Sequence, residues 1–347
     1  MFSKFNIQAP KITFILVFCY GWMAYNFVLL GASRIQKISQ VKLPHSDGDY
    51  SRLCFSVNSK KLYALDPSQG AIHTWDLMST KHQNQISINQ PVQWNQLIAI
   101  DENIILMADS KGDVWNFNLK KKTLTQLYKQ PMDDRDGMFM IFDQKSSQLI
   151  LIRSDGSIKY LGYRGEQITN ISRIDLKNGI ERVAFSKDYA NFATVDWSNN
   201  VNFRLANESK PIWTKNYKNG KICSLCFGLT KDLLVLSEID GSCWGINTKL
   251  AQVNWKISCR PRLFNTNVSQ DGNYIYVLVG SIRKIRSKTG TAAFHIHRIP
   301  DGQLVFQQKL KGDMPKALEV SPDGKFVAAL SEGKIFLWEV ESNLSEK

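Results

Sequence analysis

The sequence predicts an all-β fold, a β-propeller of seven blades, and it does so through three observations. A short apolar strand recurs along the chain, and equivalent positions in its copies are separated by 45, 42, 43, 42, 41 and 52 residues. Turn residues follow the strand in most copies, and a bulky apolar side chain follows the second turn. A unit of this length is typical of a propeller blade, which buries both of its faces only when the blades stack around a channel. The repeat is marked by Phe55, Ile100, Phe142, Phe185, Phe227, Val268 and Val320.

The last unit shows the order of elements most clearly. Val320 ends an apolar strand, and Ser321-Pro322-Asp323-Gly324 has the chemistry of a turn. A second strand is predicted over residues 326–330 and a third over 334–340, with a tight turn between them. The first turn recurs as Phe185-Ser186-Lys187-Asp188 and as Val268-Ser269-Gln270-Asp271-Gly272.

In six of the seven units the second turn carries the residues that a tight hairpin needs where φ is positive. It recurs as Ser68-Gln69-Gly70, Ser110-Lys111-Gly112, Asp155-Gly156, Ser198-Asn199-Asn200, Asp240-Gly241 and Glu332-Gly333. Five residues after the turn glycine comes a bulky apolar side chain in five units, and we expect it in the core. These side chains are Trp75, Phe117, Leu161, Ile246 and Trp338.

With these motifs in place, the chain resembles the WD-repeat family over roughly residues 35–347. Trp75-Asp76 matches the family's signature dipeptide, and the Phe-Ser-x-Asp turn before a hydrophobic strand matches its inner-strand pattern. The chain has no Gly-His dipeptide and only one Trp-Asp, so the resemblance is to a divergent, WD-like propeller. It implies a role in assembling multiprotein complexes and names no partner.

The two ends of the chain predict how the ring closes. The last unit stops after its third strand, and the segment 34–43 precedes the first unit without a blade of its own. We therefore expect residues 34–43 to supply the outer strand of the last blade, because closure removes exposed strand edges. The propeller would then span residues 34–347. The long step between the sixth and seventh units predicts a lengthened hairpin around residues 281–290.

Residues 12–30 form an uncharged apolar stretch of nineteen residues. As a helix it would be about 30 Å long, the thickness of the hydrocarbon core of a bilayer. We interpret residues 12–33 as a single-pass transmembrane anchor that follows a short tail, residues 1–11. A secretory signal peptide cleaved near Gly31-Ala32-Ser33 and an organelle-targeting segment remain alternatives. Basic residues flank both sides of the stretch, so the side of the membrane that the ring occupies stays open.

Few residues point to catalysis, and we expect neither an enzyme nor a cofactor or metal. Cys223 and Cys226 have the C-x-x-C spacing of redox and zinc sites, but residues three apart on a strand should face opposite ways. His295 and His297 would share one face of a strand without an identifiable third ligand. The acidic run 133–136 lacks the ordered ligand pattern of a calcium loop. The five cysteines outside the apolar stretch follow no disulfide pattern, which favours a reducing compartment.

Charge is the more informative signal. Only Lys4 and Lys11 precede residue 34, so the rest of the chain keeps 42 of the 44 basic residues against 31 acidic ones, a net charge of +11. Such an excess favours an acidic protein or an anionic lipid surface as a partner. No motif supports specific recognition of nucleic acid. The best candidate contacts form two clusters: Arg283, Lys284, Arg286 and Lys288, and Lys120, Lys121 and Lys122.

The sequence therefore predicts a membrane-tethered, non-catalytic propeller that acts as a protein-interaction scaffold. One alternative is an exported propeller, periplasmic or lumenal, that senses a ligand or helps to assemble an envelope. A less favoured alternative is a propeller enzyme with a site in the central channel.

Overall fold

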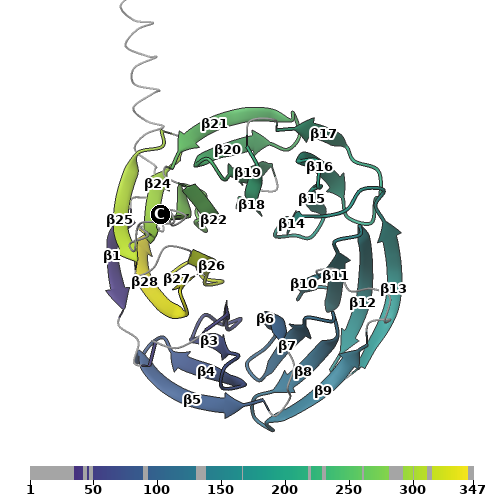
Figure 1. Cartoon of the computed structure of the whole chain (residues 1–347), viewed down its shortest axis with the longest axis vertical. Helices are drawn as coiled ribbons and strands as arrows, with labels where there is room; N and C mark the ends of the chain where they lie inside the picture. The colour runs from purple at the N-terminus through teal and green to yellow at the C-terminus, as the bar shows by residue number, and fades with distance from the viewer. Residues whose placement is uncertain are drawn as a thin grey trace, which may run out of the picture.

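The computed structural model is an all-β, seven-bladed propeller (Figure 1). It describes residues 35–41, 45–46, 50–88, 93–129, 138–165, 167–217, 220–228, 232–259, 262–280, 292–299, 301–310 and 315–342. Within these residues every regular element is a strand, and no helix is both long and apolar enough to cross a bilayer. The apolar stretch 12–30 lies outside the described residues.

Each blade is a four-stranded antiparallel sheet with its first strand nearest the channel. Blade 1 contains β2 (Arg52–Phe55), β3 (Lys61–Asp66), β4 (Ala71–Asp76) and β5 (Lys81–Ser87). Blade 2 contains β6 (Trp94–Ala99), β7 (Ile104–Asp109), β8 (Val114–Asn118) and β9 (Thr123–Tyr128). Blade 3 contains β10 (Met138–Asp143), β11 (Gln148–Arg153), β12 (Ser157–Arg164) and β13 (Gln167–Asp175). Blade 4 contains β14 (Arg182–Phe185), β15 (Asn191–Val195), β16 (Asn200–Leu205) and β17 (Trp213–Asn216).

The remaining blades follow the same order, except at the end of the chain. Blade 5 contains β18 (Ile222–Phe227), β19 (Leu233–Glu238), β20 (Ser242–Asn247) and β21 (Gln252–Ser258). Blade 6 contains β22 (Arg262–Val268), β23 (Tyr274–Gly280), β24 (Ala292–Arg298) and β25 (Leu304–Leu310). Blade 7 contains β26 (Pro315–Val320), β27 (Phe326–Ser331), β28 (Lys334–Ser342) and, as its outer strand, β1 (Ile35–Val41).

The ring is closed by β1, which pairs antiparallel with β28 from Ile35 opposite Ser342 to Val41 opposite Leu337. This strand lies within the range 34–43, from which the sequence predicts the outer strand. Blade 7 is thus built from both ends of the described chain, and its contact with blade 1 is called the seam below.

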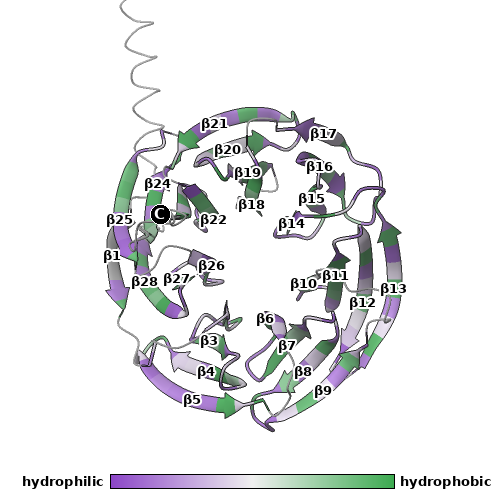
Figure 2. Ribbon diagram, viewed as in Figure 1, coloured by the Kyte–Doolittle hydropathy of each residue, from purple (hydrophilic) through white to green (hydrophobic). Residues whose placement is uncertain are grey.

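The hydrophobic core lies between the blades. The described residues form seven buried clusters, and each cluster joins neighbouring sheets. Middle strands such as β3 are almost wholly buried, whereas outer strands such as β5 are mostly exposed, and Figure 2 shows the corresponding change in hydropathy. The five side chains predicted in the core are there, each no more than 1% exposed: Trp75, Phe117, Leu161, Ile246 and Trp338.

In the six blades whose second turn is described, that turn has the backbone that the sequence predicts. Positive φ occurs at Gly70, Gly112, Gly156, Asn199, Gly241 and Gly333. At Gly156 an added Cβ would also lie 2.7 Å from the carbonyl oxygens of Leu176 and Asn178. Only glycine fits that position without a shift of the backbone.

Candidate functional site

The channel has two ends, and the turns between the first and second strands of the blades gather around one of them. This end, together with the turns between the third and fourth strands, is called the mouth face below. Serine hydroxyls fix several of the inner turns, because each donates a hydrogen bond to the side chain two residues later in the sequence. The donor–acceptor distances are 2.8 Å for Ser56–Asn58, 2.7 Å for Ser186–Asp188 and 2.6 Å for Ser321–Asp323. These hydrogen bonds give the mouth a preformed rim.

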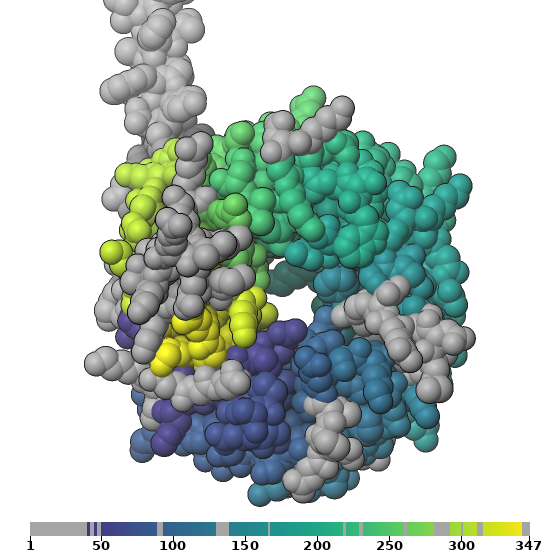
Figure 3. All heavy atoms as spheres, in the orientation of Figure 1, coloured from purple at the N-terminus to yellow at the C-terminus, as the bar shows by residue number. Residues whose placement is uncertain are grey.

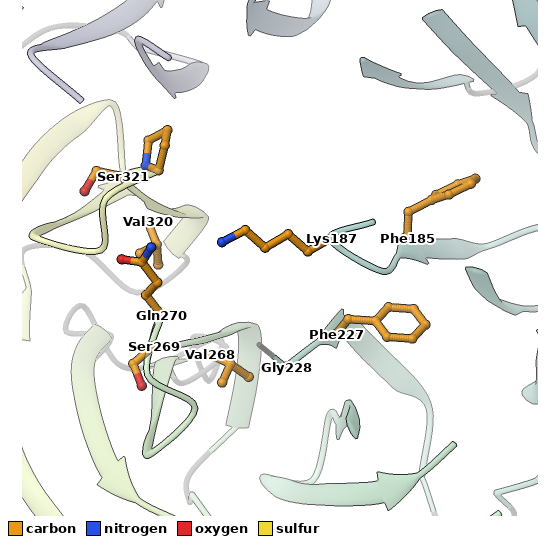
Figure 4. A pocket seen from close by; sticks show the side chains of 10 residues that line it. Phe185, Lys187, Phe227, Gly228, Val268, Ser269, Gln270, Val320 and Ser321 are labelled. Carbon is orange, nitrogen blue, oxygen red and sulfur yellow. The ribbon is translucent and has the colours of Figure 1, made fainter. Parts of the chain in front are cut away.

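A hollow of about 210 Å³ opens at this mouth and is lined by the turns of blades 4 to 7. Figure 3 shows the opening at the centre of the ring, and Figure 4 shows the hollow from close by. Lys187 extends across it toward Val320 and Gln270, while the rings of Phe185 and Phe227 turn away into the wall (Figure 4). Among the described residues that line the hollow, Lys187 is the only ionisable side chain.

A second hollow, of about 390 Å³, adjoins the first and shares Lys187 and Pro322 with it. Its other lining residues come from the inner turns of blades 1 to 4 and include Phe55, Phe142 and Lys145. The mouth therefore offers two joined hollows that share the side chain of Lys187. Each is small, of a size to receive one or two side chains rather than a large cofactor.

The acidic and basic side chains at the mouth differ in whether they are free to bind a ligand. Asp143 accepts a 2.9 Å hydrogen bond from the backbone of Lys145, and Asp188 accepts from Ser186 and from the backbone of Ala190. These carboxylates stabilise their own turns. In the described part of the chain, the ammonium groups of Lys187 and Lys145 have neither a hydrogen-bonded nor an ion-paired acceptor. The charge free to meet a ligand is thus positive.

Neighbouring blades are joined along the channel wall by hydrogen bonds between their inner strands. Arg182 donates to the carbonyl of Cys223 at 3.0 Å, from blade 4 to blade 5, and Arg52 donates in the same way to Asn95 of blade 2. The backbone of Met140 donates to Gln96, which joins blade 3 to blade 2. These contacts hold the wall rigid beneath the mouth.

Glu319 is the most perturbed acid of the channel wall. It lies on β26 beside Val320, it is half-buried, and no acceptor or donor pairs with it among the described residues. Burial raises the pKa of its carboxyl to about 7. A carboxyl with such a pKa gains or loses its proton near neutral pH, which makes the wall next to the seam sensitive to pH.

The two basic clusters predicted from the sequence have different outcomes. Lys120, Lys121 and Lys122 are exposed in the turn between β8 and β9, at the outer edge of the mouth face. Asn118 fixes this turn by accepting from the backbone of Lys120 and Lys121. The cluster Arg283, Lys284, Arg286 and Lys288 lies outside the described residues. The strand ends that flank it, Gly280 and Ala292, lie at the end of blade 6 away from the mouth face.

One sequence-based expectation about the cysteines is wrong. Cys223 and Cys226 do not face opposite ways, because a β-bulge between Ile222 and Ser224 shifts the alternation of β18. Both side chains pack against the same cluster between blades 5 and 6. Burial raises the pKa of both thiols to about 12. All five described cysteines are free thiols.

The remaining candidates for chemistry are packed or lie outside the description. His295 and His297 are buried with ring centroids 5.8 Å apart, and burial lowers the pKa of His295 to about 4. The acidic run 133–136 lies outside the described residues. In the described part of the chain, no three His, Cys, Asp or Glu side chains are arranged to hold a metal ion.

The structure brings together three histidines: His73 and His82 on the neighbouring strands β4 and β5, and His45 from the segment before blade 1. The ring of His73 is 3.1 Å from that of His82, Nδ1 to Nε2, and the centroid of His45 is 5.1 Å from that of His82. This triad lies at the seam, where the chain passes from β1 to blade 1. Burial, and secondly the neighbouring imidazoles, lowers the pKa of His82, and burial also lowers that of His73 against the opposing effect of Asp66. No sequence motif marks the triad.

Sequence reasoning also missed the position of Lys187 across the mouth, although its turn identified the repeat. One lysine among 44 basic residues carries no local mark, and only the ring geometry aims it across the mouth. Comparison with known proteins adds no assignment: no protein-family model matches the chain, and no curated protein matches it.

Proposed function

We propose that this protein is a membrane-tethered, non-catalytic interaction platform whose docking site is the mouth of the propeller channel. The observation that carries the proposal is the hollow at the mouth, where Lys187 extends between apolar walls with no acceptor among the described residues. The partner is a protein segment that places a carboxylate against Lys187 and an apolar side chain against Val268 and Val320.

The rigid rim supports this assignment on energetic grounds. An exposed ion pair is worth about 0–1 kcal/mol, but a partner that covers the mouth excludes water and strengthens the contact. Because the turns are already fixed by their serine hydrogen bonds, little ordering is needed on binding. Asp143 and Asp188, the carboxylates that line the second hollow, are engaged in their own turns, which favours a positioning role for this rim over acid–base chemistry.

The apolar stretch 12–30 supplies the tether in this proposal. A tether confines the ring to two dimensions and so raises the effective concentration of a partner in the same membrane. The localisation that we propose is therefore a single-pass membrane protein, and an anionic lipid surface near Lys120–Lys122 is compatible with it. The exported alternative predicts instead a mature chain that begins near Arg34.

A photo-crosslinking amino acid tests the docking site directly. Placed at Gln270 in the hollow, it should capture one stoichiometric protein from membranes, whereas at Gln69 in the second turn of blade 1 it should not. Lys187→Glu should weaken the complex by about tenfold or more, or ~1.4 kcal/mol. The matched control Lys111→Glu, exposed in the second turn of blade 2 on the opposite face, should leave it intact. Equal capture at both positions, or full binding by Lys187→Glu, would overturn the proposal.

A further inference from the structure

The direction of β1 fixes where the N-terminal segment meets the ring. Ile35 lies opposite Ser342, and β1 then runs back along β28 until Val41 lies opposite Leu337. On the other side of β28, Glu339 lies opposite Phe326, the first residue of β27. Phe326 directly follows the inner turn of blade 7, which belongs to the mouth face. The chain therefore enters the ring at the mouth face.

The other end of β1 points the opposite way. The chain continues from Val41 toward the second turn of blade 7, where Ser46 accepts from the backbone of Ile335 and Tyr50 donates to Gly333 at 3.3 Å. The two ends of β1 thus lie on different faces of the ring. Six strand residues at about 3.3 Å each place these faces roughly 20 Å apart.

The apolar stretch ends only a few residues before β1 begins. Residues 31–34 separate Leu30 from Ile35, and the five steps from Leu30 to Ile35 reach at most about 18 Å at ~3.5 Å per residue. This reach is shorter than the distance between the two faces. An anchor at residues 12–30 would therefore hold the mouth face nearer to the bilayer than the opposite face.

We infer that the mouth of the channel is turned toward the membrane and receives a juxtamembrane segment of an integral membrane protein. This inference rests on the tether of the proposed function and adds the origin of the partner. The space between the mouth and the bilayer admits segments that leave the membrane close by. Such a segment with an acidic residue beside an apolar one matches Lys187 and the walls formed by Val268 and Val320.

Two matched pairs of single cysteines test the orientation in the full-length chain. In blade 1, Met78→Cys lies on the mouth face and Gln69→Cys on the opposite face. In blade 4, across the ring, Ser209→Cys lies on the mouth face and Ser198→Cys on the opposite face. All four positions are exposed in turns. Each variant is labelled with a fluorophore at its new cysteine and inserted into phosphatidylcholine liposomes. The liposomes contain a lipid with a nitroxide headgroup, which quenches fluorophores near the bilayer surface. The parent chain, treated in the same way, measures the labelling of its own cysteines.

We expect several-fold stronger quenching at residues 78 and 209 than at residues 69 and 198. Stronger quenching at 69 and 198 would overturn the orientation. Comparable quenching at 69 and 78 with little at 198 and 209 would show an edge-on ring and also overturn it. A chain that does not float with the liposomes would instead refute the tether, so the two failures are distinguishable.

The origin of the partner is tested by mapping the crosslink from residue 270. Mass spectrometry should place the captured peptide next to a membrane-spanning segment of the partner. Capture of a peptide from a protein without such a segment would overturn the inference while leaving the docking site of the proposed function intact.

Discussion

The seam between blades 7 and 1 and the interior of blade 3 bury similar kinds of side chain but are held together differently. In blade 3 the four strands follow one another, and β12 and β13 form a long hairpin from Ser157 opposite Asp175 to Arg164 opposite Gln167. In blade 7, which forms one side of the seam, β1 pairs with β28, which lies about 300 residues away in the sequence. Closing such a long loop costs entropy that a hairpin does not. The seam is therefore expected to open before blade 3 does.

The largest expected effect on stability comes from truncating a core side chain on each side of this comparison. Trp75 is fully buried at the seam, and Leu161 occupies the equivalent position in blade 3. We expect Trp75→Ala to lower the free energy of unfolding by about 4 kcal/mol and Leu161→Ala by about 3 kcal/mol, because each leaves a cavity. Denaturant unfolding measures both values. Hydrogen exchange should show faster opening of β1 in Trp75→Ala but not in Leu161→Ala, and the reverse pattern would break the comparison.

A pH-dependent effect is expected at Glu319. Its folded pKa of about 7 lies above the value of an unfolded glutamate, so ionisation costs stability as pH rises from about 4.5 to 7. Glu319→Gln should raise the free energy of unfolding at pH 8 by up to about 3 kcal/mol, since each pKa unit is worth about 1.4 kcal/mol. At pH 4.5 the substitution should change little. A gain of equal size at both pH values would contradict the assigned cause.

A smaller effect is expected where blade 6 is linked to the closing strand. Gln308 accepts from the indole of Trp338 at 2.7 Å and donates to Gln40 of β1. Gln308→Ala should cost about 1–2 kcal/mol, because the buried indole N–H loses its acceptor. Gln126→Ala, which removes an exposed hydrogen bond to Asp113 in blade 2, is the matched control. Exchange of the β1 amides should rise in the first variant only.

The smallest effect is the response of the seam to acid. The lowered pKa values of His73 and His82 mean that the unfolded chain takes up protons more readily than the folded one as pH falls below about 6.5. Stability at the seam should thus decline between pH 7 and pH 5. Blade 3 contains no histidine and should not respond in this way. Hydrogen exchange at both pH values measures the difference, and His82→Gln should reduce it.

The sequence predicted what depends on local chemistry. The turns within one repeat predict positive φ at Gly156 and Asn199 and the buried position of Trp75. The number of repeats along the chain predicts the number of blades. The sequence could not predict what the ring alone brings together. The meeting of His45, His73 and His82 depends on closure by β1, and the aim of Lys187 depends on seven turns sharing an axis. The bulge at Cys223 was missed because alternation was assumed to be regular.

The most direct measurement of the central proposal is native mass spectrometry of the full-length protein purified from solubilised membranes. We predict a stoichiometric complex with one protein partner for the unaltered chain and for Lys111→Glu, and its loss in Lys187→Glu. A lone monomer in every preparation, or an intact complex with Lys187→Glu, would contradict the proposal that the channel mouth is a docking site.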